Sequence, residues 1–203
     1  AQVGAMLARM HVAGQDYAAK QPNLRGLSWW TDTVPVVVPH LNSAQKDVIE
    51  SELAFQQGLA KTDAYQGLPK GPIHADLFRD NVMFDGPQLS GFFDFYFAGC
   101  DTFSFDIAVC LNDWCIDLAT GQLDEARAQA FVAAYDAQRK LTDAELALLP
   151  SLLRSAALRF WTSRLWDFYL PRDAAMLQPH DPTHFERVLT LRRQSPWQYQ
   201  RAA

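Results

Sequence analysis

Several features that would place the chain in a special class are missing from its sequence. It has only three cysteines in 203 residues, an odd number, and no charged-then-apolar leader, which argues against an exported protein held by disulfides. The longest stretch without a charged residue, 33–45, covers thirteen residues and contains two prolines, whereas a membrane-spanning helix needs about 20 apolar residues. We therefore expect a protein of a reducing, cytoplasmic setting without a membrane segment.

The composition is that of a chain able to build a core. Hydrophobic residues make up 49% and aromatic residues 12%, while Gly (10) and Pro (11) are at ordinary levels, which excludes a disordered or collagen-like chain. The net charge of −5 argues against a nucleic-acid partner, because phosphate contacts need a positive surface. Length and composition predict one globular domain. No feature of the sequence predicts an oligomeric state.

Acidic residues are concentrated in the middle of the chain. Between His74 and Asp117 there are eight Asp, no Glu and one basic residue, Arg79, whereas the chain from Pro150 onward has eight Arg, no Lys and four acids. Carboxylates gathered so densely repel one another unless they are solvated or hold cations. A purely solvated surface would mix Glu and Lys, but these acids stand among Phe and Trp. We therefore look for a hard-metal site in this region.

Helical periodicity covers most of the chain. Val3, Leu7 and Met10 repeat at helical spacing with no capping residue before them, so we expect the chain to be part of a longer protein. The stretch 21–41 contains three prolines and predicts a long irregular connection. Further helices are expected at 43–58, 106–118, 123–139, 142–169 with a break near Pro150, and from Asp181, where Asp181 and Pro182 would be the N-cap and N1 residues.

One region has the shorter period of β-strands. The apolar runs 82–84 and 91–93 flank a turn at Asp85-Gly86-Pro87, which is typical of a β-hairpin. The sequence thus predicts a mainly α-helical fold with a small β-hairpin near its middle.

The loop before this hairpin has the residue types of a phosphoryl-transfer site. His74, Asp76 and Asn81 match the H-x-D-L-x-x-x-N form of kinase catalytic loops, with Ala75 in place of the usual Arg, and Asp94 ends the hairpin. One carboxylate can take the proton of an attacking hydroxyl, while an amide oxygen and a second carboxylate can hold Mg²⁺ against nucleotide phosphates. Taken singly, each of these polar residues could also be an ordinary turn residue.

These motifs, with Phe93-Asp94-Phe95 and Phe105-Asp106-Ile107-Ala108, resemble the aminoglycoside phosphotransferase and choline kinase superfamily of small-molecule kinases. Within it, the chain is most similar to bacterial homoserine kinases of the phosphotransferase-like type, on further runs at 22–26, 29–30, 94–98, 112–115, 159–165 and 181–185. The similarity covers essentially the whole chain. It implies only the C-terminal, helical lobe of a protein-kinase-like fold, because neither a glycine-rich loop nor a Val-Ala-Ile-Lys-like strand is found.

The resemblance implies roles for the site residues. Asp76 would be the catalytic base, Asn81 and Asp94 the magnesium ligands, and His74 and Asp106 structural supports of the site. ATP would be the co-substrate and a small molecule the acceptor. The implied organisation is one kinase-like lobe over 1–203, with leading helices and a connection in 1–72, the catalytic loop and metal-binding hairpin in 73–100, and a helical substrate-side subdomain in 101–203; the N-terminal nucleotide lobe is absent from the chain.

For the acceptor, the resemblance implies L-homoserine, phosphorylated to O-phospho-L-homoserine in threonine biosynthesis. The carboxylate of such an amino alcohol needs a guanidinium, from Arg159 or Arg164, and its ammonium needs an acid, for which Asp113 is the candidate. An aminoglycoside or choline-type acceptor and a non-catalytic kinase-like binding domain stay open as alternatives. Without a nucleotide lobe, residues 1–203 alone are expected to be inactive.

Overall fold

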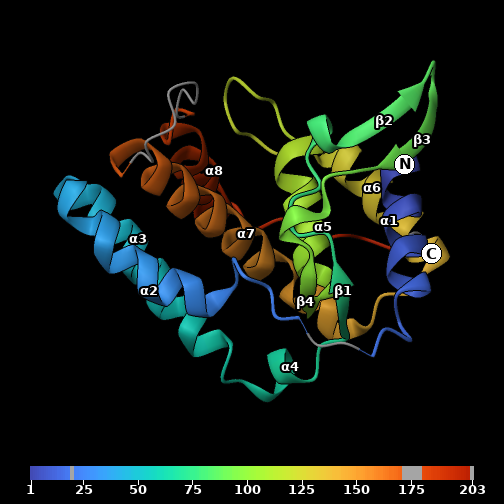
Figure 1. Ribbon diagram of the computed structural model, residues 1–203, viewed down its shortest axis with the longest axis horizontal. Coiled ribbons are helices and arrows are strands. Elements are labelled where there is room, and N and C mark those ends of the chain that lie inside the picture. The colour runs from blue at the N-terminus through green and yellow to red at the C-terminus, as the bar shows by residue number, and fades with distance from the viewer. Residues whose placement is uncertain (19–20, 171–179, 202–203) are drawn as a thin grey trace.

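The computed structural model describes residues 1–18, 21–170 and 180–201 (Figure 1). The helices are α1 (Gln2–Ala13), α2 (Leu27–Val37), α3 (Ser43–Leu59), α4 (Asp63–Gln66), α5 (Phe103–Trp114), α6 (Glu125–Gln138), α7 (Asp143–Tyr169) and α8 (Thr183–Gln194). The strands are β1 (Lys70–Ile73), β2 (Val82–Asp85), β3 (Gln88–Phe92) and β4 (Gly99–Thr102), and short 3₁₀ turns cover Val38–His40, Arg79–Asn81 and Phe95–Phe97. No helix in these ranges is long and apolar enough to cross a membrane.

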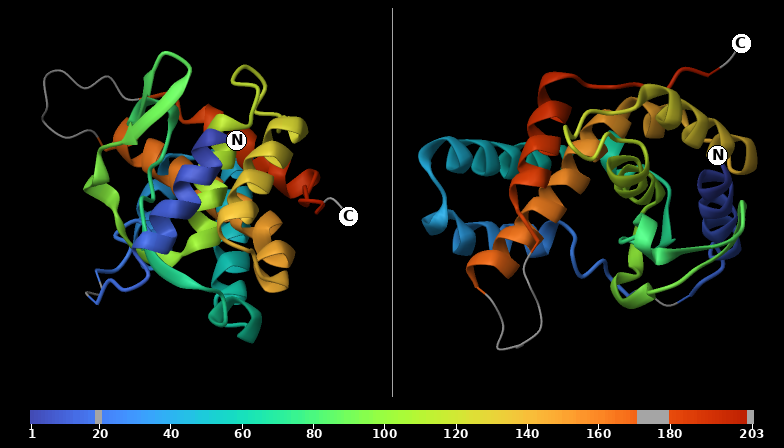
Figure 2. Two further views of the ribbon diagram at one scale, coloured as in Figure 1. Left: turned by 90° about the vertical axis from the view of Figure 1, so that its right-hand side faces the viewer. Right: turned by 90° about the horizontal axis from the view of Figure 1, so that it is seen from above.

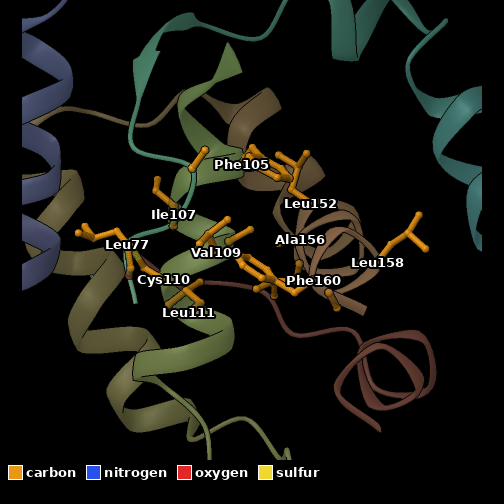
Figure 3. Close-up of a cluster of buried hydrophobic side chains, with 14 of the residues drawn as sticks. Leu77, Phe105, Ile107, Val109, Cys110, Leu111, Leu152, Ala156, Leu158 and Phe160 are labelled. Carbon is orange, nitrogen blue, oxygen red and sulfur yellow. The ribbon is translucent and has the colours of Figure 1, made fainter. Parts of the chain in front are cut away.

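Helices α5 and α7 form the centre of the fold. They pack along each other, α8 lies on α7, and α1 pairs with α6. Helices α2 and α3 lie at the end of the molecule opposite α1 (Figure 2). Every residue of α5 from Phe103 to Asn112 is buried, as expected for a helix enclosed on all sides. Figure 3 shows the core between the two central helices, with Phe105 and Val109 of α5 near Ala156 and Phe160 of α7.

Side-chain caps determine where two of the expected helices begin. The Asn42 side chain accepts a hydrogen bond from the backbone N–H of Gln45, whose own side chain accepts one from the Asn42 backbone. Thr142 and Glu145 form the same reciprocal pair at the start of α7. Such capping boxes satisfy N–H groups that have no partner within the helix, and they explain why both starts lie where the sequence predicted.

The prediction of an irregular connection over 21–41 is wrong, because this stretch contains α2 and the 3₁₀ turn that follows it. Trp30, Val34 and Val37 are buried at helical spacing, and α2 packs against α3 and α7. Burial of this apolar stripe outweighs the cost of Pro35 inside the helix. Pro39 stands at the start of the 3₁₀ turn, where a missing N–H costs little.

Two predicted details around prolines are also wrong. Helix α7 runs through Pro150 without a break, because Leu149, Leu152 and Leu153 are buried on either side of it and their packing offsets the lost hydrogen bond. Helix α8 begins at Thr183 instead of Asp181, with Pro182 at the N-cap position. Asp181 still accepts a hydrogen bond from the Thr183 backbone N–H at 2.9 Å, so it contributes to the cap from one residue further out.

A second strand pair accompanies the expected hairpin. Strands β2 and β3 form the hairpin, while β1 and β4 pair in antiparallel register from Lys70–Thr102 to Ile73–Gly99. The β1–β4 pair joins the chain segments before and after residues 74–98. It therefore anchors the predicted catalytic loop and the hairpin at a common base beside α5.

The close approach of α1 and α6 leads to a prediction about stability. A Cβ atom on Gly4 would lie 2.3 Å from the carbonyl oxygen of Phe131 in α6, whereas one on Gly58 in α3 would meet nothing within 4 Å. We expect Gly4→Ala to lower the free energy of unfolding by about 1–3 kcal/mol, because the two backbones must separate. Gly58→Ala, the matched control, should raise it by about 0.5–1 kcal/mol. Urea unfolding of the full-length variants measures both, and a Gly4→Ala protein of unchanged stability would contradict this packing.

Candidate active site

The predicted catalytic loop follows β1 directly and has a constrained backbone. Ala75 is fully buried and has φ +65°, a left-handed conformation that is unusual for a residue other than glycine. The backbone N–H groups of His74 and Ala75 donate to the two carboxylate oxygens of Asp106 in α5, each at 2.8 Å. These two bonds hold the loop in its strained conformation.

Asp106 is the centre of a buried network that reaches α1 and α6. Its Oδ2 lies 3.0 Å from His11 Nε2, and His11 Nδ1 lies 2.7 Å from the hydroxyl of Tyr135. All three side chains are fully buried. A neutral imidazole protonated at Nε2 satisfies both contacts, donating to Asp106 and accepting from Tyr135. Burial raises the pKa of Asp106, but the bonds from His11 and the His74 backbone outweigh it and hold that pKa below its usual value.

His74 joins the loop to the residue that directly follows the hairpin. Its Nδ1 accepts the backbone N–H of Asp76 at 3.3 Å, and its Nε2 donates to the carbonyl of Phe93 at 2.9 Å. The imidazole also lies 4.7 Å from the Phe95 ring, measured between ring centres. Both ring nitrogens are thus occupied by backbone groups, one on each side of the predicted site.

The structure brings Asp76, Asn81 and Asp94 together. Asn81 Nδ2 donates to the Asp76 carbonyl at 2.8 Å, and the Asn81 carbonyl accepts from the backbone N–H of Phe93 at 3.2 Å. Asp94 follows directly in a left-handed conformation, φ +59°, and is exposed. Its negative charge contributes to raising the pKa of Asp76, which places the two carboxylates within electrostatic reach.

The oxygen donors available here fit a hard cation. Asn81 binds the loop through its Nδ2, so the oxygen of the same amide and the exposed carboxylate of Asp94 are two candidate donors. Mg²⁺ keeps several waters and takes few protein ligands. Over residues 1–18, 21–170 and 180–201, no group of three or more His, Cys, Asp or Glu is arranged for a metal, so any cation at this position would rely on these two donors, water and a ligand.

Asp76 is partly buried next to a buried arginine. Burial raises its pKa above the usual value, and the charges of Arg159, His74 and Arg164 oppose that rise. Oδ1 of Asp76 lies 3.3 Å from Nη2 of Arg159, whose side chain is 4% exposed. Burial lowers the pKa of Arg159 to about 10, so it remains a cation at neutral pH. Its guanidinium lies over Phe160 at 3.7 Å and over Phe97 at 5.1 Å.

The three predicted acceptor-binding residues have different partners. Arg159 and Arg164 both lie within electrostatic reach of Asp76. Asp113 is instead engaged by Arg79, since its Oδ2 accepts from the backbone N–H at 2.9 Å and from Nε at 3.2 Å. A third bond joins Arg79 Nη2 to the Asp113 carbonyl. Asp113 therefore secures the turn Arg79–Asn81, and its carboxylate is already bound by Arg79.

Sequence reasoning missed two residues of this site. His11 follows the first predicted helical stretch, and nothing local indicates that it meets Asp106, 95 positions away. Arg25 belongs to the run 22–26 that contributes to the family resemblance, but no role was derived for it. Its guanidinium carbon lies 4.3 Å from the Trp29 ring centre and 5.3 Å from that of Phe97. The aromatic residues next to it were the available signal.

A helical lobe in which a buried aspartate holds an Asp-x-x-x-x-Asn loop beside a hairpin is the architecture of kinase-like phosphotransferases. The chain belongs to the phosphotransferase enzyme family, whose sequence model matches residues 1–141. It is 64% identical over 197 residues to a homoserine kinase of Polaromonas naphthalenivorans (strain CJ2), covering 97% of this chain and 62% of that protein. A homoserine kinase of Janthinobacterium sp. (strain Marseille) is 59% identical over 192 residues, covering 95% and 60%. The chain thus spans about 60% of the length of these relatives.

Solved structures share the fold at low sequence identity. Amicoumacin kinase hAmiN superposes with a TM-score of 0.63 at 21% identity, covering 96% of this chain and 58% of that one. An ethanolamine kinase of Plasmodium vivax superposes with a TM-score of 0.60 at 16% identity, covering 94% and 57%. The predicted fold class, a mainly helical lobe of kinase-like type, is confirmed.

The Asp106 network predicts that replacement of Asp by Asn lowers stability far more at position 106 than at position 94. Asp106→Asn removes the buried negative charge and places an amide N–H₂ opposite N–H groups that donate to the carboxylate in the unaltered protein. We therefore expect the free energy of unfolding to fall by about 2–5 kcal/mol. Asp94→Asn, on an exposed residue in a conformation that Asn tolerates, should change stability by less than about 0.5 kcal/mol. Thermal and urea unfolding of both variants give the comparison. Equal stability of the two variants would show that Asp106 does not hold the loop.

Proposed function

We propose that the protein containing this chain is an ATP-dependent kinase that phosphorylates the hydroxyl of L-homoserine to O-phospho-L-homoserine, a step of threonine biosynthesis. One observation carries the proposal: the Asp76, Asn81 and Asp94 constellation occurs in a chain that is 56–64% identical to several proteins named homoserine kinase. The family assignment supplies the reaction class, and the relatives suggest the acceptor.

Asp76 is proposed as the catalytic base. As the acceptor hydroxyl oxygen attacks the γ-phosphorus of ATP, its proton passes to the Asp76 carboxylate and ADP leaves. Burial raises the pKa of Asp76, which makes it a stronger base than an exposed aspartate. The cations around it, Arg159 and Arg164, oppose that shift and so favour the ionised form that can accept a proton.

Asn81 and Asp94 are proposed as the protein ligands of Mg²⁺, which would neutralise charge on the nucleotide phosphates. Their oxygen donors and the exposure of Asp94 support the assignment. The related fold of amicoumacin kinase hAmiN has been solved with AMP-PNP and Ca²⁺, a nucleotide analogue together with a divalent cation. His74 and Asp106 are proposed as supports that position the loop carrying the base.

The acceptor's charged groups are proposed to meet residues of α5 and α7. Arg159 and Arg164 are candidates for the carboxylate, supported by their nearness to Asp76. Asp113 remains the candidate for the ammonium, which would have to compete with Arg79 for its carboxylate. Cys110 and Cys115 are buried free thiols, which supports the proposal of a reducing, cytoplasmic setting.

An acceptor panel tests the proposed reaction. The full-length protein, supplied with Mg·ATP, should phosphorylate L-homoserine with the highest kcat/KM among L-homoserine, L-serine, choline and kanamycin, measured by ADP release. L-Serine is one methylene shorter, so its hydroxyl falls short of Asp76 and kcat/KM should be lower by about 10–200-fold or more. Preference for choline or kanamycin would overturn the acceptor but keep the kinase. Failure with every acceptor would favour a non-catalytic binding domain.

Removing the proposed base should slow chemistry without weakening nucleotide binding. We expect Asp76→Asn to reduce kcat by about 10²–10⁴-fold, with the Kd of the ATP analogue AMP-PNP changed less than about threefold. Asp80→Asn, an exposed neighbour in the same loop, should keep near-normal turnover. More than half of the normal kcat in Asp76→Asn, with chemistry rate-limiting, would remove Asp76 from this role.

The pH profile gives a second measurement on the same residue. A base works when deprotonated, so kcat/KM should fall as the pH drops through the pKa of Asp76. Because burial raises that pKa, the acidic limb should lie above the usual range of an exposed aspartate, near pH 4. An acidic limb at or below that range would contradict the burial of the base.

A further inference from the structure

A cavity of about 440 Å³ lies between α6, α8 and the chain that follows α8. Its lining includes Leu123 from the loop before α6, Leu191 and Arg192 from the last turn of α8, and Trp197. The volume is within the usual range of small-molecule sites, which combine an apolar lining with a few polar groups. None of the lining residues belongs to the catalytic loop or to the hairpin, so the cavity is separate from the candidate active site.

The wall formed by the chain after α8 is anchored to α6. The Gln129 side chain of α6 exchanges two hydrogen bonds with the backbone of Gln200, and Arg201 forms an ion pair with Asp136 of the same helix at 2.9 Å. Figure 2 shows this C-terminal segment running from α8 towards α6. The cavity is therefore formed before a ligand binds, which lowers the entropic cost of binding.

Arg192 brings a buried guanidinium to this cavity. The residue is 3% exposed, and its Nε donates to Oδ1 of Asn112 in α5 at 3.0 Å. Over residues 1–18, 21–170 and 180–201, neither Nη1 nor Nη2 has a hydrogen-bond partner, and Nη2 is enclosed by protein whereas Nη1 is not. A basic side chain in the last turn of a helix can bond the final carbonyls, but Arg192 makes no such bond within these ranges. Two of its nitrogens are thus left to bind a ligand.

The charge of Arg192 has no counter-ion in the part of the chain that the structure describes. The other two buried arginines there are paired with carboxylates, at 2.9 Å for Arg139 and 3.3 Å for Arg159. Burial lowers the pKa of Arg192 to about 10, and the one described group whose charge opposes this shift is the thiol of Cys115.

That thiol cannot neutralise the arginine. Burial raises the pKa of Cys115 to about 12, so at neutral pH the thiol is uncharged while Arg192 is a cation. The carboxylate of Glu125 also lines the cavity, but it does not contribute to the pKa of Arg192. A buried charge without an opposite charge is costly. An anion bound in the cavity would supply both the missing charge and acceptors for the free N–H groups.

We propose that this cavity is a second ligand site of the protein, which binds a small monocarboxylate through the terminal nitrogens of Arg192. The apolar part of the ligand packs on Leu123, Leu191 and Trp197. A guanidinium matches the planar, two-oxygen geometry of a carboxylate. The apolar lining and the negative charge of Glu125 favour a ligand with one negative charge over phosphate or a dicarboxylate. The site is additional to the proposed kinase reaction and does not depend on it.

Two compounds of the same shape test the proposal. 4-Methylpentanoate carries a carboxylate, whereas 4-methylpentanamide is neutral, and calorimetric titration of the full-length protein at constant ionic strength gives the Kd of each. We expect the carboxylate to bind about 10–150-fold more tightly than the amide, the range for a charge-assisted hydrogen bond. Arg192→Met should abolish this preference, and Arg192→Lys should keep part of it. Equal Kd values, no binding of the carboxylate, or a preference that survives Arg192→Met would overturn the proposal.

A second pair of variants leaves Arg192 and its bond to Asn112 intact, in case their loss impairs folding. Ser195 is exposed and lines the cavity, so the indole of Ser195→Trp should occupy part of it and raise the Kd of 4-methylpentanoate by about tenfold or more. Ser43→Trp, the same change at the exposed first residue of α3, is the matched control and should leave that Kd unchanged. An unchanged Kd in Ser195→Trp would show that the compound binds outside the cavity, against the proposal.

Discussion

The site depends on one buried carboxylate. Asp106 accepts the backbone N–H groups of His74 and Ala75 and is bonded to His11, so a strained loop, the central helix α5 and the N-terminal helix α1 meet at a single group. A buried charge that lost any of these partners would cost several kcal/mol. The three segments therefore have to fold together. Asp76 directly follows Ala75 in the loop, so the same bonds determine its position.

Desolvation acts in opposite directions on the pKa values of Asp76 and Arg159. Burial raises the pKa of Asp76 and lowers that of Arg159. Burial of either side chain alone would favour its neutral form, whereas the opposite charge of the neighbouring side chain favours the ionised form of each. The charge of Arg159 therefore favours the ionised form of the Asp76 carboxylate, which is the form that the proposed deprotonation of a hydroxyl requires.

The parts predictable from sequence are those encoded over short distances. The loop motif, the hairpin turn and the capping residues Asn42 and Thr142 each act within a few positions, and the motif identified the residues that the structure brings together. Strands β1 and β4 read Lys-Gly-Pro-Ile and Gly-Cys-Asp-Thr, which have little strand propensity, so only their pairing reveals them. Helix α2 forms although it contains Pro35, because the burial of its apolar side chains against the rest of the fold stabilises it. His11 escaped prediction because its contacts with Asp106 and Tyr135 join residues far apart in the sequence.

The acidic middle of the chain has a different explanation from the one its composition first suggests. Most of its eight aspartates are matched by protein groups: Asp76 by Arg159, Asp113 by Arg79, and Asp106 by His11 and backbone N–H groups. Asp101 accepts from Asn23 and the Thr102 backbone, and Asp117 from Thr120. Asp80, Asp85 and Asp94 remain exposed. Of these, Asp94 alone follows the residue bonded to the Asn81 backbone, so the cation site proposed above would consist of one carboxylate and one amide.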